Sequence, residues 1–221
     1  MAERFRLTLA QMNPTVGDLE GNAAMARAAW AEARAAGADM VAFPEMFLTG
    51  YQLQDLVKKP AFAMDVQRVL TRLAEACADG PAIGIGGPLP GGAKPFNAYF
   101  ILQGGTVTAQ VLKHHLPTYN VFDETRYYHP GDPAGPVRVG PLRIGVPICE
   151  DAWFEDVTET LAETGAEILL VPNGSPYHRG KMDTRQAIMV ARVVETGLPL
   201  AYLNLLGGQD DQVFDGGSFV L

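Results

Sequence analysis

The order of hydrophobic and polar residues predicts short buried strands that alternate with amphipathic helices. Alternating apolar residues over 5–9 indicate a first strand. A helical pattern follows over about 18–36, where Asp18 is a good N-cap and Gly37 is typical of the position just after a helix. The chain therefore begins with a strand followed by a helix.

The rest of the chain continues this alternation. Gly104-Gly105 separates two apolar runs and supplies the positive φ angles of a tight β-hairpin turn. Further strands are predicted over 39–45, 82–87, 97–103, 106–113, 142–148, 166–172, 199–206 and 216–221, and further helices over about 65–78, 156–163 and 183–196. This order favours a layered α/β fold. No linker, repeat or low-complexity segment divides the chain, and its last residues lie in an apolar strand, so we expect one domain truncated at its C-terminus.

Composition narrows the class of protein. The chain has 221 residues, of which 48% are hydrophobic, enough for one sizeable core. Its net charge of -8 argues against a nucleic-acid partner, which requires a basic surface. The N-terminus lacks the features of a secretory signal, and no apolar run approaches the ~18 residues of a membrane span. We expect a soluble cytoplasmic protein with no membrane partner.

Three reactive residues follow three predicted strands: Glu45, Lys113 and Cys149. Strand ends place side chains on rigid supports around a common site. A carboxylate can take the proton of a thiol, and an ammonium can stabilise the thiolate and an oxyanion. A turn at Cys149 would expose its sulfur and offer the backbone N–H of Glu150 as an oxyanion donor. Taken singly, each residue also fits a structural thiol, a solvated lysine or a capping glutamate.

The remaining cysteine and the histidines indicate no other chemistry. Cys77 lies in a helical pattern that is typical of a buried structural thiol. With two cysteines and no zinc-ligand spacing, neither a disulfide framework nor a zinc site is expected. The four histidines show no ligand pattern beyond the adjacent pair His114-His115, so no metal is predicted.

Three sequence blocks surround the reactive residues: FPEMFLTGY at Glu45, LKHHLPTYNVFDETRYYHPG at Lys113 and GVPICEDAW at Cys149. In this order they resemble the three signature blocks of the nitrilase (carbon-nitrogen hydrolase) superfamily. The resemblance implies a four-layer α-β-β-α sandwich. It also implies that Glu45 is the general base, Lys113 the transition-state cation and Cys149 the nucleophile.

Finer similarity points to one branch of that superfamily. LPTYNVFDETRYYHPG, ICEDAW and LNLLGGQDDQVFDGGSFV resemble the glutaminase (glutamine amidotransferase) domain of glutamine-dependent NAD⁺ synthetases. The resemblance implies that residues 1–221 form this single domain, without its last segment and without the ATP-dependent synthetase domain, whose Ser-Gly-Gly-x-Asp-Ser loop the chain lacks. It implies no cofactor here, with ATP and Mg²⁺ expected only in the synthetase domain. The implied partners are glutamine, the synthetase domain and further copies in a homo-oligomer.

The same resemblance assigns a substrate site. It implies that glutamine is held near Tyr51, Tyr119, Trp153, Ser175 and Lys181. Trp153 stands where phenylalanine is usual and Lys181 where arginine is common, and core packing remains an alternative for Trp153.

Glu124 falls near a second glutamate that orients the lysine in many relatives. A carboxylate beside Lys113 would keep the ammonium protonated and fix its position. A surface salt bridge between Glu124 and Arg126 is the alternative.

The predicted reaction is hydrolysis of the glutamine side-chain amide through a cysteine thioester. The ammonia would serve an ATP-dependent synthetase domain that converts deamido-NAD⁺ to NAD⁺. One alternative is a free-standing amidase or nitrilase that acts on another small amide. The other is a catalytically silent binding module that retains the fold.

Overall fold

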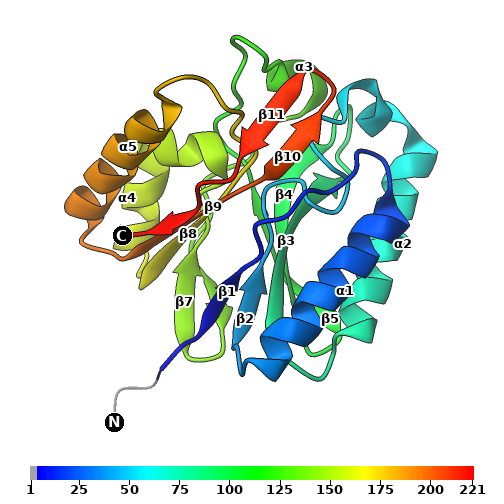
Figure 1. Cartoon of the computed structure of the whole chain (residues 1–221), viewed down its shortest axis with the longest axis horizontal. Coiled ribbons are helices and arrows are strands. Elements are labelled where there is room, and N and C mark those ends of the chain that lie inside the picture. The colour runs from blue at the N-terminus through cyan, green and yellow to red at the C-terminus, as the bar shows by residue number, and fades with distance from the viewer. Residues whose placement is uncertain (1–3) are drawn as a thin grey trace.

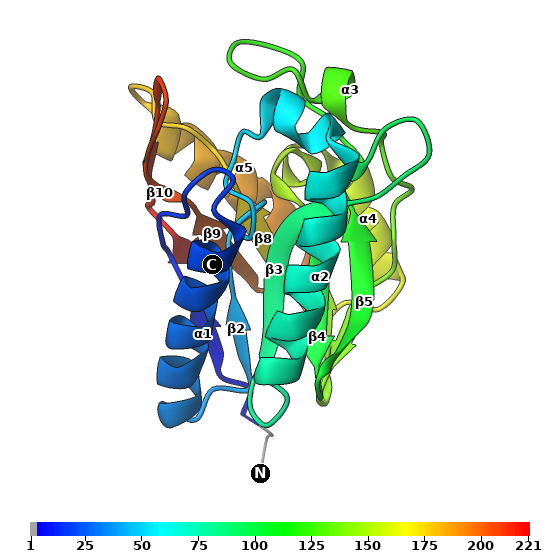
Figure 2. The same ribbon diagram turned by 90° about the vertical axis from the view of Figure 1, so that its right-hand side faces the viewer.

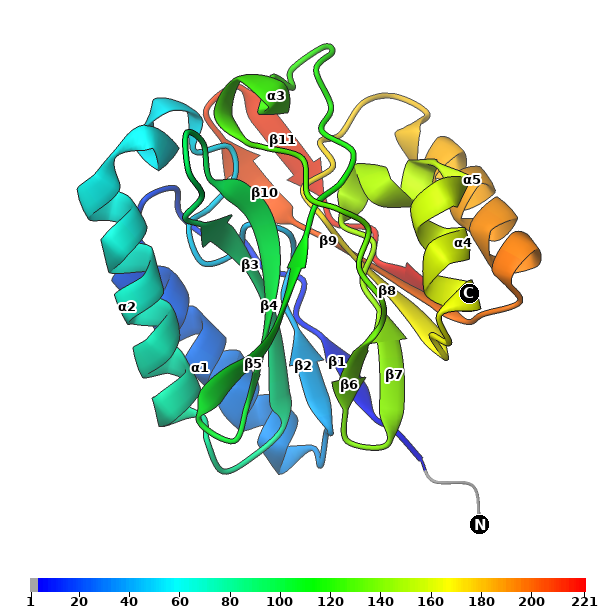
Figure 3. The same ribbon diagram turned by 180° about the vertical axis from the view of Figure 1, so that it is seen from behind.

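The computed structural model describes residues 4–221, which form four layers: two helices, a five-stranded sheet, a second five-stranded sheet and two more helices (Figure 1). Figure 3 shows the layers side by side, with α1 and α2 outside one sheet and α4 and α5 outside the other. This confirms the predicted α-β-β-α sandwich.

The first sheet has the order β1-β2-β3-β4-β5. Its first three strands run parallel and the last two add antiparallel pairs. The strands are β1 (Leu7–Leu9), β2 (Met40–Ala42), β3 (Ala82–Leu89), β4 (Phe96–Gln103) and β5 (Thr106–Leu112).

The second sheet has the order β12-β9-β8-β7-β6, with a parallel centre and antiparallel edges. Its strands are β6 (Val137–Val139), β7 (Leu142–Gly145), β8 (Ile168–Asn173), β9 (Leu200–Asn204) and β12 (Phe219–Val220). A separate hairpin pairs β10 (Leu206–Gln209) with β11 (Gln212–Asp215) and lies above the second sheet in Figure 1.

Four long helices cover the outer faces of the sheets, as Figure 2 shows for the side that carries α1 and α2. They are α1 (Leu19–Ala35), α2 (Pro60–Ala76), α4 (Glu155–Glu163) and α5 (Lys181–Thr196). Three short elements lie in the loops: the 3-10 helices η1 (Gln54–Lys58) and η2 (Cys149–Trp153), and α3 (Glu124–Tyr127). None of the helices within residues 4–221 has both the length and the apolar character that crossing a membrane requires.

Three apolar cores hold the layers together, one between the first sheet and its helices, one between the two sheets and one between the second sheet and its helices. Phe43, Leu70 and Phe100 lie in the core between the first sheet and its helices. The two sheets meet through residues such as Ile144 and Leu170, which are almost fully buried. Burial of such side chains contributes about 25 cal/mol for each Å² of apolar surface removed from water. These buried cores make the sheets and helices a rigid frame, on which the loops at the strand ends are carried.

Local sequence signals explain several boundaries. The Asp18 carboxylate accepts the Gly21 N–H at 2.9 Å, as an N-cap should, and Gly37 has the predicted left-handed conformation with φ 69°. The hairpin turn at Gly104-Gly105 has φ values of 58° and 84°, which confirms the predicted turn.

Other boundaries differ from the prediction. Helix α2 begins at Pro60 rather than near residue 65, because proline fits the first turn of a helix, where its missing N–H is not needed. The strand predicted over 142–148 ends at Gly145, two residues before Pro147, which cannot donate a ladder hydrogen bond. The short elements η1, α3 and β6 were not predicted.

Candidate active site

The three reactive residues meet above the strand ends, between the two sheets. Lys113 directly follows β5, Glu45 lies three residues beyond β2, and Cys149 is the first residue of η2, four residues beyond β7. Their exposed fractions are 0% for Glu45, 0% for Lys113 and 4% for Cys149. The predicted residues therefore come together in a buried site to which both sheets contribute.

Lys113 lies between two carboxylates. Its Nζ is 2.7 Å from Glu45 Oε1, to which it donates a hydrogen bond, and 2.9 Å from Glu124 Oε2. Burial alone would lower the pKa of Lys113, but Glu124 and Glu45 outweigh it and hold this pKa well above its ordinary value. Lys113 is thus a permanent ammonium at neutral pH.

Glu45 is fixed at both carboxylate oxygens. Asn97 Nδ2 donates to Oε1 at 2.8 Å, beside the Lys113 hydrogen bond, and the Gly174 N–H donates to Oε2 at 2.8 Å. Asn97 Nδ2 also lies 3.3 Å from Glu124 Oε1, so one amide bridges both carboxylates. Asn97 and Gly174 were not predicted, although a polar residue inside the apolar run NAYFILQ was the available signal for Asn97.

Close backbone packing brings Glu45 to its partners. A Cβ on Gly86 would lie 2.2 Å from the Met46 nitrogen, and one on Gly174 would lie 2.6 Å from the Tyr51 ring. Glycine at these two positions therefore lets β3 and the end of β8 approach the turn that carries Glu45.

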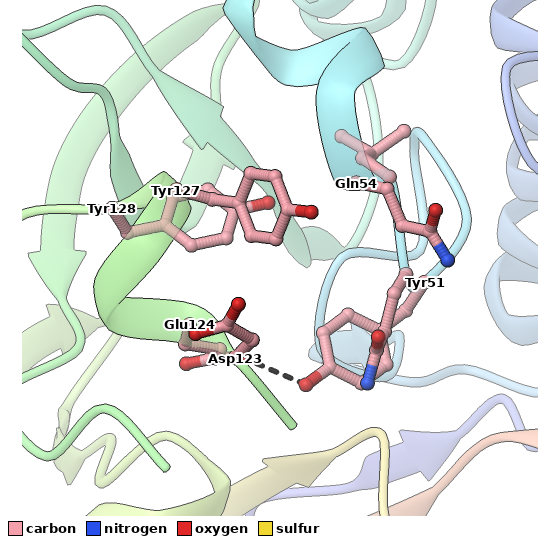
Figure 4. A pocket seen from close by; sticks show the side chains of 8 residues that line it. Tyr51, Gln54, Asp123, Glu124, Tyr127 and Tyr128 are labelled. Carbon is pink, nitrogen blue, oxygen red and sulfur yellow. Dashed lines mark hydrogen bonds between the residues drawn. The ribbon is translucent and has the colours of Figure 1, made fainter. Parts of the chain in front are cut away.

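Glu124 is a buried partner of Lys113 rather than a surface residue. It is 3% exposed, and Arg126 instead lies 3.9 Å from Asp123. The Tyr51 hydroxyl donates to Glu124 Oε1 at 2.8 Å, as Figure 4 shows at the edge of a small pocket of about 10 Å³. Burial raises the pKa of Glu124 to about 7, with Lys113 opposing this rise and Glu45 adding to it.

Cys149 occupies a strained turn. Its φ of 51° is a left-handed conformation that is uncommon for residues other than glycine, as expected of a nucleophile elbow. Burial, followed by the charge of Glu45, raises the pKa of the thiol well above its usual value, although Lys113 lowers it. The sulfur is therefore a protonated thiol at neutral pH and needs a base. Among residues 4–221 the Glu150 N–H has no hydrogen-bond partner, which leaves it free to act as an oxyanion donor.

Asp151 ties the lysine segment to the cysteine turn. Its Oδ1 accepts the N–H groups of His114 at 3.0 Å and His115 at 2.7 Å, while Oδ2 accepts the Ile148 N–H at 3.0 Å. Burial raises the pKa of Asp151 to about 6 against the effect of these N–H donors. No local pattern indicates this role, because the two segments are far apart in the chain.

The predicted substrate residues divide into two groups. Tyr51 and Ser175 are almost fully buried and already bonded, since the Ser175 hydroxyl accepts Arg185 Nε at 3.2 Å. Arg185, also unpredicted, is fully buried and donates to Asp215 at 2.8 Å.

The other group, Tyr119, Trp153 and Lys181, is less buried. The Tyr119 hydroxyl donates to both oxygens of Glu150, at 2.7 and 2.9 Å, and Lys181 Nζ lies 4.3 Å from the centre of the Trp153 ring. Tyr119 and Lys181 line one cleft of about 370 Å³, together with Pro176, the neighbour of Ser175. Burial lowers the pKa of Lys181.

The fold also brings two histidines to an aspartate. One possible ligand atom from each of His114, His115 and Asp156 lies within 4.8 Å of the others. The adjacent histidines alone had predicted no such group, because Asp156 is distant in sequence and is positioned by α4.

The sequence matches the carbon-nitrogen hydrolase family over residues 6–221. It is 60% identical over 221 residues to the glutamine-dependent NAD(+) synthetase of Rhodobacter capsulatus, a match that covers 100% of this chain and 40% of that protein. The solved glutamine-dependent NAD(+) synthetase of Acinetobacter baumannii, in complex with ADP, superimposes with a TM-score of 0.92 at 31% identity, covering 98% of this chain and 41% of that one.

A shorter protein has the same fold. The amidase of Nesterenkonia sp. AN1, in a structure with acrylamide added at its active site cysteine, superimposes with a TM-score of 0.87 at 25% identity and covers 99% of this chain and 85% of its own. The chain thus spans most of the amidase but only about two fifths of the synthetases.

Proposed function

The chain belongs to the carbon-nitrogen hydrolase family, and from this premise we propose that it hydrolyses the side-chain amide of glutamine. One observation carries the proposal: a protonated Lys113 lies between two buried carboxylates at a site that also holds a strained, buried Cys149. Amide hydrolysis needs a nucleophile, a base and a positive charge near the developing oxyanion, and this group of residues supplies all three.

The proposed first half-reaction forms a thioester. Cys149 Sγ attacks the amide carbon while Glu45 takes the thiol proton. The oxyanion is stabilised by the Lys113 ammonium and the Glu150 N–H. Glu45 then gives its proton to the amide nitrogen, the C–N bond breaks, and ammonia leaves a γ-glutamyl thioester on Cys149.

The second half-reaction releases glutamate. Glu45 takes a proton from water as the water oxygen attacks the thioester carbonyl, and the proton returns to the departing sulfur. Because Lys113 and Asn97 both donate to Glu45 Oε1, its Oε2 is the oxygen with fewer partners and serves as the base in both halves.

Glutamine as the substrate rests on the similarity to glutamine-dependent synthetases. In this proposal Tyr119 and Lys181 hold the amino-acid end of glutamine at the entrance cleft, while Trp153 packs beneath Lys181. The ammonia then serves an ATP-dependent synthetase domain of the kind that makes these relatives longer, which converts deamido-NAD⁺ to NAD⁺.

The sharpest test replaces the two cysteines separately. Cys149→Ala should lower glutamine-dependent NAD⁺ formation by the full-length protein by about 10⁴-fold or more, as expected for removal of a nucleophile, while ammonia-dependent formation persists. Cys77→Ala removes a thiol in the helix-facing core and should leave both activities unchanged. A trapped γ-glutamyl adduct on wild type, absent from Cys149→Ala, would identify the intermediate. Loss of ammonia-dependent activity in Cys149→Ala would contradict this division of labour.

A free-standing amidase is the second candidate, favoured by the near-complete match to the Nesterenkonia amidase. It uses the same catalytic residues, so substrate comparison separates the two. Higher kcat/KM for acrylamide or propionamide than for glutamine would favour the amidase. A silent binding module is disfavoured by the intact catalytic group, and such a module should not react selectively at Cys149 with a glutamine-like diazo ketone.

A further inference from the structure

Two histidine rings and a carboxylate meet just outside the catalytic residues. The His115 Nε2 atom lies 2.9 and 3.0 Å from the two oxygens of Asp156, and the rings of His114 and His115 pack edge to face with centroids 4.6 Å apart. One donor atom from each of the three side chains lies within 4.8 Å of the others.

This arrangement is unusual for adjacent residues. Side chains of successive residues in an extended chain point to opposite faces. Here Asp151 Oδ1 accepts the N–H groups of both His114 and His115, which bends the segment and brings the two rings together. Asp156 approaches from the first turn of α4, where its Oδ1 also accepts the Val157 N–H.

The hydrogen bond of His114 is an independent indication of a ligand. Its Nδ1 lies 2.7 Å from the Gly131 carbonyl oxygen. A carbonyl oxygen can only accept, so Nδ1 is the donor, and in the neutral ring Nε2 then offers its lone pair to a ligand. This bond from the second ring nitrogen to a backbone carbonyl is how metal-binding histidines are oriented in proteins.

We propose that His114, His115 and Asp156 form a binding site for one divalent transition-metal cation of the Zn²⁺ class. Two imidazoles and a carboxylate are ligands that Zn²⁺ accepts at roughly 2.0–2.2 Å, with water in the fourth position. A tetrahedral site brings ligand atoms to roughly 3.4 Å from one another. The Asp156 side chain is half exposed, which leaves it room to adjust its position toward a bound cation.

The cation would join two segments that the active site depends on. His114 and His115 directly follow Lys113, and Asp156 lies just beyond η2, which begins with Cys149. A metal bound to both segments stabilises the folded chain by an amount that rises with the logarithm of its free concentration over its dissociation constant. The site is thus a metal-dependent clamp outside the catalytic group, with no part in the bond-breaking steps.

Titration calorimetry with Zn²⁺ alone tests the proposal. We expect one Zn²⁺ per chain in wild type and in His129→Asn, a matched control because the His129 ring packs on Phe96, away from the three ligands. His115→Asn and Asp156→Asn should each weaken binding at least tenfold, since even the loss of a second-shell partner costs about 10–100-fold. Asp156 is about half exposed, so its variant keeps the test valid where a histidine variant fails to fold.

The catalytic thiol is the competing ligand. Cys149→Ala should bind Zn²⁺ as tightly as wild type, and Co²⁺ in the site should show ligand-field absorption without a thiolate charge-transfer band. The melting temperature should rise with Zn²⁺ in wild type and not in Asp156→Asn. Loss of binding in Cys149→Ala, unchanged binding in both Asp156→Asn and His115→Asn, or no saturable binding in wild type would each overturn the site.

Discussion

The floor and the rim of the active site are built on different physical principles. The floor, which we define as Glu45, Asn97, Lys113, Glu124 and Cys149, is at most 4% exposed, and its charged groups and the Asn97 amide nitrogen are already paired. The rim, which we define as Tyr119, Trp153 and Lys181, lies in a loop, at the end of η2 and at the start of α5, and Tyr119 is 43% exposed. Each rim residue has one side-chain polar or cation–π partner.

This difference separates chemistry from recognition. Charges in a buried site interact strongly and require no reorganisation during reaction, whereas exposed pairs contribute at most about 1 kcal/mol. We therefore expect changes in the floor to lower kcat and changes in the rim to raise KM.

Replacing Lys113, whose ammonium lies at the centre of the floor, should give the largest loss of activity. Lys113→Met removes the positive charge from between Glu45 and Glu124 and leaves two buried carboxylates facing each other. We expect kcat to fall by about 10³-fold, at the upper end of the loss of one oxyanion donor, and the free energy of unfolding to fall by about 3–5 kcal/mol. Steady-state kinetics and urea unfolding measure the two effects.

The exposed Lys59 provides a matched control. Lys59→Met removes the same charge from the surface and should leave kcat, KM and stability unchanged. A Lys113→Met protein that remains folded and retains more than a tenth of the wild-type kcat would contradict the role of the ammonium.

The same contrast explains what the sequence could predict. Glu45, Lys113 and Cys149 could be predicted because they follow predicted strands and lie in sequence blocks that resemble those of a known superfamily. Strand and helix periodicity predicted a layered α/β fold, and the resemblance to the superfamily implied its four layers. Both signals come from residues that are close together in the sequence, and both describe regions where packing allows few alternative conformations.

The residues that were missed act between distant segments. Asn97 bridges two carboxylates. Asp151 accepts the N–H groups of two residues that lie 36 and 37 positions before it in the chain. Gly174 donates to Glu45, which lies 129 positions before it. A polar residue within an apolar run marks Asn97 as unusual, but nothing in the local pattern identifies the partners of these three residues. Tyr51 shows the related limit: its position in the motif suggested substrate contact but did not indicate that its hydroxyl donates to Glu124.

Glu124→Gln tests whether the floor depends on a second negative charge. Burial raises the pKa of Glu124 to about 7, so the wild-type carboxylate is lost as the pH falls through 7, and kcat/KM should decline there. Glu124→Gln should lower the plateau of kcat/KM above pH 7 by about 10–100-fold, which corresponds to the roughly 1.5–3 kcal/mol of a hydrogen bond to a charged group. The variant should also lack the decline of kcat/KM as the pH falls through 7. An identical acid limb in both proteins would rule out Glu124 as its source.

The raised pKa of Glu124 also predicts that stability changes with pH in the opposite direction to kcat/KM. The folded-state pKa of about 7 is above the reference value of 4.5, so the folded protein binds more protons than the unfolded chain between these pH values. This stabilising contribution is complete below about pH 4.5 and is lost as the pH rises through 7. The free energy of unfolding of wild type, measured relative to Glu124→Gln, should therefore fall from pH 4.5 to 7.

Lys181 at the rim should give the smallest effect and the opposite kinetic signature. Lys181→Met removes a partly buried ammonium that we propose pairs with the α-carboxylate of glutamine, so KM should rise about tenfold, equivalent to a charged hydrogen bond of about 1.5 kcal/mol, with kcat within about twofold of wild type. Lys181→Arg keeps the charge and the contact with Trp153 and should restore most of the affinity. A fall in kcat at unchanged KM would place Lys181 with the floor and would remove the distinction between the two regions.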